Sequence, residues 1–293
     1  MTRLHTEVRG SGPALVLLHG WGLNVRVWDG LAAALCDRFR IVAIDLPGHG
    51  RSAWLPERSS LAEQAAQVHE TIAGVTAKYS LLGWSFGGQI ALQLAAAQHA
   101  ADARGTPLAA TVDRLVLIAT TPRLVAAPDW PHGAPPERLA AQAAGLRTDY
   151  RRTVSDFLEL QVRGSAGGAE ALDQLRAALF AHGLPAAAAT ADGESQTDMH
   201  ERASVAGLNL AALARDLELL RDTDLRPQIA DITLPALVIA GQYDRVTMPA
   251  ASHALAQALP NARYAEIRRA AHAPFLSHLA RLTELLCDFL LQP

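Results

Sequence analysis

The segment Tyr79-Ser-Leu-Leu-Gly-Trp-Ser-Phe-Gly-Gly-Gln89 joins a short apolar run to a stretch with helical spacing. Residues Tyr79–Leu82 have the length and apolar character of a buried strand, and a helix is predicted to begin near Gln89. Between them lies Gly83-Trp84-Ser85-Phe86-Gly87, a G-x-S-x-G sequence. Its glycines permit a tight, strained turn that lifts the Ser85 hydroxyl over the carboxyl end of the strand. The pattern alone also occurs in glycine-rich turns without chemistry, but the strand before it and the helix after it make Ser85 a candidate nucleophile.

Short apolar runs and helix-like stretches alternate on both sides of this turn. Strands are predicted at Ala14–Leu18, Arg40–Ile44, Val112–Ala119, Pro235–Ala240 and Ala262–Ile267, and helices at Trp28–Cys36, Leu61–Val75, Gln89–Ala97, Pro249–Ala258 and Ser277–Leu291. This alternation is typical of βαβ units, and strands that are apolar throughout are typical of a sheet covered on both faces. The sequence therefore predicts an α/β fold with a mostly parallel central sheet flanked by helices.

The segment between about Pro122 and Pro227 has a different character. Strand-like runs disappear, alanine, arginine and leucine recur at helical spacing, and several prolines interrupt the segment. We predict a helical cap of residues 122–227, inserted into a core domain made of residues 1–121 and 228–293. Within the cap, Pro185–Asp198 lacks periodicity and is interpreted as a mobile surface loop rather than a functional element.

A serine hydroxyl becomes a good nucleophile only when a base takes its proton, so a histidine and an orienting carboxylate are expected nearby. His272 lies between the last predicted strand and the last predicted helix, which places it at the same sheet edge as Ser85. Asp244 follows the strand Pro235–Ala240 at that edge. The chain order Ser85, Asp244, His272 favours a catalytic triad.

Asp244 could have another role, and other carboxylates are candidates for its place in the triad. Asp244 could instead cap the helix that follows it, although that position is nearer Thr247. Asp222 and Asp224 lie at the exit of the cap rather than after a strand. Asp45, in the turn 45–52, precedes the nucleophile in the sequence and is interpreted as structural.

The loop His19-Gly20-Trp21-Gly22 follows the first strand of this pattern. In folds of this kind such a loop supplies a hydrogen-bond donor to the carbonyl oxygen under attack. We assign the backbone N–H groups of Trp21 and Phe86 to this oxyanion hole, where one donor is typically worth roughly 3 kcal/mol. His19 is interpreted as bracing the loop rather than transferring protons.

Composition narrows the function classes. The chain has 293 residues, 50% of them hydrophobic and 19% charged, with a net charge of −3, so a globular protein without general attraction to nucleic acid is expected. The apolar run Ala14–Leu18 is too short for a signal or membrane segment, and we predict a cytoplasmic protein with no membrane association. Cys36 and Cys287 lack metal-ligand spacing. Hydrolysis by a serine triad requires no metal or organic cofactor, and none is expected.

With these residues assembled, the chain resembles the α/β-hydrolase superfamily over essentially its whole length. Within it, the chain is similar to the pimeloyl-[acyl-carrier protein] methyl ester esterases of biotin biosynthesis. The closer likeness rests on Trp21-Gly22-Leu23-Asn24 with Val27-Trp28, Asp45-Leu46-Pro47-Gly48, Gly83-Trp84-Ser85, Arg152-Thr153-Val154 with Phe157-Leu158 and Leu160-Gln161, and residues 270–275. The cap motif distinguishes this group, because many relatives share the other motifs.

The resemblance implies an acyl site and a partner. It implies that the acyl site is lined by Trp21, Ser85, Phe86, Phe157, Leu158, Glu159, Leu160, Gln161 and His272. It also implies an ester substrate carried on acyl carrier protein, with cap arginines contacting the acidic carrier: Arg152 at a matching position, extended by Arg147, Arg151, Arg163 and Arg176. Asp156, however, stands where the family has another arginine, and these arginines could instead be the solvated face of cap helices.

The expected reaction is therefore hydrolysis of a carboxylic methyl ester by a monomeric serine enzyme. One alternative is a broad short-chain carboxylesterase, a lactonase or a C–C bond hydrolase with the same triad, because the triad sets the reaction class and the cap sets the substrate. Haloalkane and epoxide chemistry is disfavoured, since those relatives carry aspartate at the nucleophile position. Another alternative is a ligand-binding protein that keeps the fold without turnover.

Overall fold

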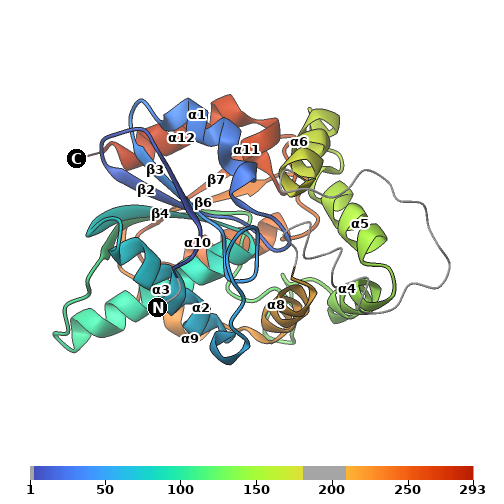
Figure 1. Cartoon of the computed structure of the whole chain (residues 1–293), viewed down its shortest axis with the longest axis horizontal. Helices are drawn as coiled ribbons and strands as arrows, with labels where there is room; N and C mark the ends of the chain where they lie inside the picture. Colours follow the sequence, from blue (N-terminus) through green and yellow to red (C-terminus); the bar gives the residue numbers. More distant parts are fainter. Residues whose placement is uncertain (1–2, 181–208, 293) are drawn as a thin grey trace.

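The computed structural model describes residues 3–180 and 209–292, and a seven-stranded sheet forms its centre (Figure 1). The strands are β1 (Thr6–Arg9), β2 (Ala14–Leu18), β3 (Arg40–Ile44), β4 (Lys78–Trp84), β5 (Thr111–Ile118), β6 (Ala236–Gly241) and β7 (Ala262–Ile267). Their order across the sheet is β1-β3-β2-β4-β5-β6-β7, and every neighbouring pair is parallel except β1 with β3. The predicted α/β class with a mostly parallel sheet is confirmed.

Helices cover both faces of the sheet (Figure 1). One group packs together on one face: α1 (Asp29–Leu35), α11 (Pro274–Ser277) and α12 (Leu279–Leu290). A second group lies on the other face: α2 (Leu61–Ala73), α3 (Phe86–Ala103) and α9 (Arg226–Ile229). The remaining core helix, α10 (Pro249–Ala258), packs against β6 and β7, and the 3₁₀ turns η1 (Val25–Trp28) and η2 (Pro56–Arg58) lie in loops. Because both faces are covered, every residue of β2 and of β6 is buried, as the apolar runs in the sequence predict.

The helices that the structure describes between residues 136 and 222 lie to one side of the sheet (Figure 1). These cap helices are α4 (Pro136–Thr148), α5 (Tyr150–Val162), α6 (Gly168–Phe180) and α8 (Leu210–Asp222). They come between β5 and β6 in the sequence, within the segment predicted to form the cap. The exact domain boundaries stay a prediction, and the predicted loop Pro185–Asp198 lies outside the described residues.

Hydrogen bonds tie the cap helices to loops of the core. The indole N–H of Trp21 donates to the carbonyl oxygen of Leu213 in α8, at 2.9 Å. The side-chain amide of Asn24 donates to the carbonyl oxygen of Ala178 in α6, also at 2.9 Å. All four residues are buried, so these bonds are shielded from water and hold α6 and α8 against the loop that follows β2.

Three elements differ from the sequence prediction. The strand β1 was not predicted, because an antiparallel edge strand that is partly exposed carries no continuous apolar run. Helix α3 begins at Phe86 rather than near Gln89, since Ser85 itself occupies the N-cap position. The helix predicted at Ser277–Leu291 is α12 and begins at Leu279, because the backbone of His278 leaves the helical region and separates it from the unpredicted short helix α11.

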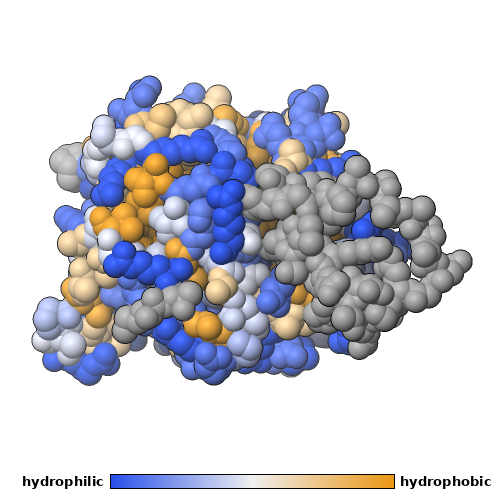
Figure 2. Space-filling model, viewed as in Figure 1, coloured by the Kyte–Doolittle hydropathy of each residue, from blue (hydrophilic) through white to orange (hydrophobic). Residues whose placement is uncertain are grey.

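The core is dense and rich in tryptophan near the carboxyl edge of the sheet. Trp28, Trp84 and Phe275 form one aromatic cluster, with ring centroids of Phe275 4.5 Å from Trp28 and 4.7 Å from Trp84. All three are at most 1% exposed. On the face shown in Figure 2, hydrophilic and hydrophobic residues are interspersed. Among the helices of the described part of the chain, none is both long and apolar enough to cross a membrane.

Candidate active site

Ser85 occupies a strained turn between β4 and α3. Its backbone has φ 55° and ψ −118°, a conformation that costs free energy for a residue with a side chain. Neighbouring backbone comes very close, because a Cβ added to Gly87 would meet the carbonyl oxygens of Leu18 and His19. The Thr120 hydroxyl donates to the Ser85 carbonyl oxygen at 2.7 Å and holds the turn from the β5 side. Packing on two sides therefore maintains the strain that exposes the serine hydroxyl.

His272 and Asp244 form a buried pair on the loops after β7 and β6. The imidazole Nδ1 lies 2.8 Å from Asp244 Oδ2, and both side chains are fully buried. Asp244 Oδ1 accepts the backbone N–H groups of Val246, at 2.8 Å, and Thr247, at 3.0 Å. With Oδ1 accepting these two donors, Oδ2 is left to accept a hydrogen bond from the imidazole, which requires a proton on Nδ1. The other ring nitrogen, Nε2, is thereby left as a base.

The His272 backbone is fixed by both parts of the molecule. Its N–H donates to the carbonyl oxygen of Gln161 in cap helix α5 at 2.9 Å, and its carbonyl oxygen accepts the indole N–H of Trp84 at 2.8 Å. The Nε2 atom is buried and has no hydrogen-bond partner among residues 3–180 and 209–292. The structure contains no hydrogen bond between Nε2 and the Ser85 hydroxyl. A hydrogen bond between nucleophile and base is often long or poorly aligned until substrate binds.

The proposed oxyanion donors lie next to the serine. A Cβ placed on Gly20 would be 3.3 Å from Ser85 Cβ, so the loop after β2 directly contacts the nucleophile turn. Neither the Trp21 N–H nor the Phe86 N–H donates a hydrogen bond to any residue that the structure describes. Two unused N–H groups flanking the serine are what an oxyanion hole requires.

A cavity of about 280 Å³ lies over Ser85. Apolar side chains from several elements line it: Trp21, Leu124, Leu139, Phe157, Leu160, Leu217, Leu220 and Val246. Polar side chains at its wall are Gln89, Thr120, Thr121, Arg138, Gln142, Thr153, Asp156 and Thr247. Such a mixture, mainly apolar with a few polar groups, is typical of a site for a small organic ligand. The serine therefore faces a space that can hold an acyl chain.

A family model described as alpha/beta hydrolase fold matches residues 13–279. The chain belongs to the α/β-hydrolase family. The pimeloyl-[acyl-carrier protein] methyl ester esterase of Nitrosomonas europaea is 36% identical to this hydrolase, over 94% of this chain and 95% of that protein. The protein of that name from Xanthomonas campestris pathovar campestris is 37% identical, over 98% of each chain. The resemblance stated from the sequence motifs is confirmed.

Solved structures agree on the fold of this hydrolase. An esterase from Exiguobacterium antarcticum superposes with a TM-score of 0.78 and covers 99% of this chain and 96% of its own. Its sequence identity is only 20%, so this likeness concerns the fold alone.

The predicted acyl-site residues are divided between the cavity and its surroundings. Trp21, Ser85, Phe157 and Leu160 line the cavity of the hydrolase. The others are not part of the wall that the described residues form: Phe86, Leu158, Glu159, Gln161 and His272. Their assignment to the acyl site stays a prediction.

Several cavity residues were missed in the sequence. Leu217 and Leu220 come from α8, and Leu139 and Gln142 come from α4. Their amphipathic spacing indicates a buried face but does not say what that face contacts. Gln89 could have been found, because it follows Ser85 by one helical turn at the same end of α3.

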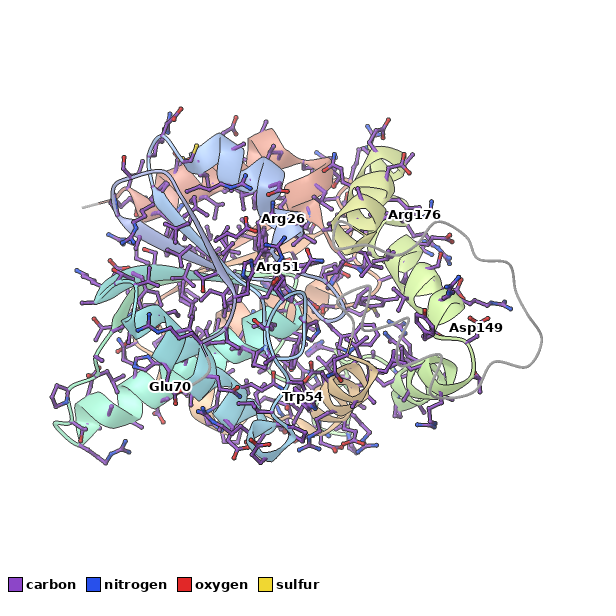
Figure 3. The ribbon with its side chains drawn as sticks, in the orientation of Figure 1. Arg26, Arg51, Trp54, Glu70, Asp149 and Arg176 are labelled. Carbon is purple, nitrogen blue, oxygen red and sulfur yellow. The ribbon has the colours of Figure 1, made fainter. Side chains whose placement is uncertain are left out.

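The cap arginines of the predicted carrier contact come from α4, α5, the C-cap of α5 and α6, and acidic side chains lie near two of them. Arg147, Arg151, Arg152 and Arg163 are exposed. Arg152 lies 3.7 Å from Asp156 one helical turn later, and Arg176 lies 3.2 Å from Glu159 across two helices. Arg176 on α6 and Asp149, at the turn between α4 and α5, are labelled in Figure 3. Acidic neighbours therefore reduce the positive field of this surface, and a carrier contact stays a prediction.

Metal binding has no obvious place in the described ranges. Among residues 3–180 and 209–292, no group of three or more histidine, cysteine, aspartate or glutamate side chains could hold a metal ion.

Proposed function

We propose that this hydrolase cleaves the methyl ester of a pimeloyl group carried on acyl carrier protein and releases methanol, a step of biotin biosynthesis. One observation carries the reaction class: the buried Asp244–His272 pair, 2.8 Å apart, leaves Nε2 unpartnered among the described residues at the sheet edge where Ser85 is exposed by its turn. The names of relatives that are 36% and 37% identical over nearly the whole chain support the substrate.

The reaction proceeds in two halves. His272 Nε2 takes the proton of the Ser85 hydroxyl as its oxygen bonds to the ester carbonyl carbon, and the Trp21 and Phe86 N–H groups stabilise the oxyanion. The tetrahedral intermediate collapses, the bond to the methoxy group breaks, and His272 returns the proton so that methanol leaves. Water then adds to the acyl-serine by the same route and releases the free carboxylate. Asp244 stays ionised throughout and stabilises the imidazolium that forms in each half.

The deciding experiment compares a carrier-bound ester with free esters. Purified protein is given pimeloyl-[acyl-carrier protein] methyl ester, free monomethyl pimelate and a short-chain p-nitrophenyl ester. We expect the carrier-bound ester to be cleaved with the highest kcat/KM. Cleavage of the free esters with equal or higher kcat/KM would contradict the carrier-bound substrate while leaving ester hydrolysis in place.

The arginine assignment has its own test. Arg152→Glu should lower kcat/KM for the carrier-bound ester several-fold at low ionic strength and leave the free esters unchanged, because exposed charges mainly steer association. Glu170→Arg, which changes an exposed cap charge outside the predicted contact, is the control. Equal effects of Arg152→Glu on both kinds of ester would remove Arg152 from the contact.

A second candidate is a carboxylesterase for small free esters. It is favoured by the ion pairs of Arg152 with Asp156 and of Arg176 with Glu159, which reduce the attraction to an acidic carrier. Both candidates use the same triad, and a monomeric, cytoplasmic enzyme is part of the proposal in either case.

A further inference from the structure

Two buried histidines join the loop of residues 19–22 to the loop of residues 45–52. His19, at the end of β2, and His49, in the second loop, have no exposed surface, and their ring centroids are 5.3 Å apart. Neither takes part in the proposed reaction. Because the first loop carries Trp21, a candidate oxyanion donor, whatever fixes this loop also fixes the hole.

Each histidine belongs to one loop and accepts a hydrogen bond from the other. Nε2 of His19 accepts the Leu46 N–H at 3.0 Å, and Nε2 of His49 accepts the Gly22 N–H at 3.0 Å. On the opposite side of each ring, Nδ1 faces a carbonyl oxygen of its own loop, Gly20 at 2.8 Å and Pro47 at 3.1 Å. These four contacts require both rings to be neutral with the proton on Nδ1.

The surroundings favour these neutral rings. Burial lowers the pKa of His19 to about 4 and that of His49 to about 3. The Asp45 carboxylate beside them accepts hydrogen bonds from the backbone N–H groups of Val25, at 2.7 Å, and Arg51, at 2.9 Å. Arg51, labelled in Figure 3, lies on the second loop and is exposed. Both Nε2 atoms are therefore acceptors at neutral pH.

The cap contributes to the same region through α8. Asp216 Oδ2 lies 3.8 Å from His49 Nε2, and Asp216 Oδ1 accepts the Gln64 side-chain N–H at 2.7 Å. Burial raises the pKa of the Asp216 carboxyl to about 8, so this group is neutral at pH 7. It does not replace the Gly22 N–H as a partner of His49, because 3.8 Å exceeds hydrogen-bond length.

We propose that His49 is a positioning residue of the oxyanion hole, which orients the Trp21 N–H toward the ester carbonyl by holding the next peptide group, Gly22 N–H, on its Nε2. Gly22 has a left-handed backbone conformation, with φ 73°. The chain therefore makes a tight turn immediately after Trp21, where no regular secondary structure holds it. The inference rests on the proposed ester hydrolysis but not on the identity of the acyl group.

The test replaces His49 by two residues of similar size. In His49→Gln the side-chain oxygen can still accept the Gly22 N–H, whereas in His49→Met no acceptor remains. For a p-nitrophenyl ester, with active sites counted by fluorophosphonate labelling, we expect His49→Met to lower kcat by about 10²-fold with KM within two-fold, as loss of an oxyanion donor does. His49→Gln should retain most of kcat. A trifluoromethyl ketone forms an adduct with the serine that carries an oxyanion. In each His49 variant, its inhibition constant should rise by the same factor by which kcat/KM for the ester falls.

A matched control separates positioning from packing. Gln98 is another buried side chain that accepts a backbone N–H, that of Val112 at 2.7 Å, between α3 and the start of β5. Gln98→Met should lower the melting temperature without changing kcat per active site. Equal kcat losses in the two His49 variants, or unchanged ketone inhibition in His49→Met, would overturn the positioning role. Absence of ester hydrolysis in the wild type would overturn the proposed function together with this inference.

Discussion

The carboxyl edge of the sheet and the cap differ in what holds their functional side chains. At the edge, backbone groups fix each candidate catalytic residue: Ser85 by its turn, Asp244 by two backbone N–H groups, and His272 by its own N–H and carbonyl. In the cap, the cavity wall is assembled from side chains of α4, α5 and α8, many of them only partly buried. The difference indicates that the edge sets the reaction and that the cap sets the substrate.

The largest expected effect concerns the edge. Ser85→Ala removes the proposed nucleophile and should lower kcat for any ester on the order of 10⁵-fold, because the remaining donors and binding contacts supply only residual catalysis. Fluorophosphonate labelling should disappear as well. The melting temperature should change little, since alanine keeps the Cβ and with it the same backbone strain, and the loss of one oxygen atom opens no large cavity. Ester cleavage at the wild-type rate by the folded variant would remove Ser85 from the mechanism.

The next effect tests the orientation of the base. In Asp244→Asn one side-chain oxygen can still accept the Val246 and Thr247 N–H groups, so the new amide nitrogen faces His272 Nδ1. An N–H donor there favours the tautomer with the proton on Nε2, which cannot accept the serine proton. We expect kcat to fall about 10⁴-fold with KM nearly unchanged. A loss below ten-fold in steady-state assays would mean that another carboxylate orients the imidazole.

The same contrast explains how much the sequence could predict. A local sequence pattern indicates each of Ser85, Asp244 and His272, because each follows a predicted strand. Parallel strands have their carboxyl ends at the same edge of the sheet, so the three residues are expected there together. The cavity residues Leu217 and Gln142 carry no such signal, because a leucine or glutamine on a helix looks alike whether it faces a ligand or another helix. The edge strand β1 was not predicted either, because a strand that is partly exposed has no continuous apolar run in its sequence. The pair of Arg152 with Asp156 follows from their four-residue spacing on one helix, whereas the pair of Arg176 with Glu159 depends on how α5 and α6 pack.

A smaller effect is expected in the cap. Phe157 lines the cavity and its ring lies edge-on to Trp21, with centroids 5.1 Å apart. Phe157→Ala should raise KM for monomethyl pimelate about ten-fold through lost apolar contact, and should change KM for methyl acetate less than two-fold, because the short acyl group does not reach the ring. Phe157→Leu, which keeps an apolar wall, is the control. Equal changes for both esters would mean that the ring orders Trp21 rather than contacting the acyl chain.

The smallest effect lies where the two regions meet, at Asp216 of α8. The pKa of this carboxyl is raised by burial to about 8, against 3.8 ordinarily, so the folded protein keeps a proton that the unfolded chain loses above about pH 4. The unfolded state therefore binds fewer protons between pH 4 and pH 8, and the stability contributed by Asp216 falls as pH rises through that window. Asp216→Asn does not titrate, and its amide oxygen can still accept the Gln64 N–H.

We expect the melting temperature of Asp216→Asn to equal that of the wild type near pH 4 and to exceed it by about 2–6 °C at pH 8, measured by calorimetry. Asp156→Asn, an exposed carboxylate on the same cap, should show no such pH-dependent difference. A variant less stable than the wild type at pH 8 would mean that Asp216 is ionised in the folded protein and paired with a charged His49. In that case the ring could not accept the Gly22 N–H, so the measurement also tests the proposed positioning of Trp21, the candidate oxyanion donor.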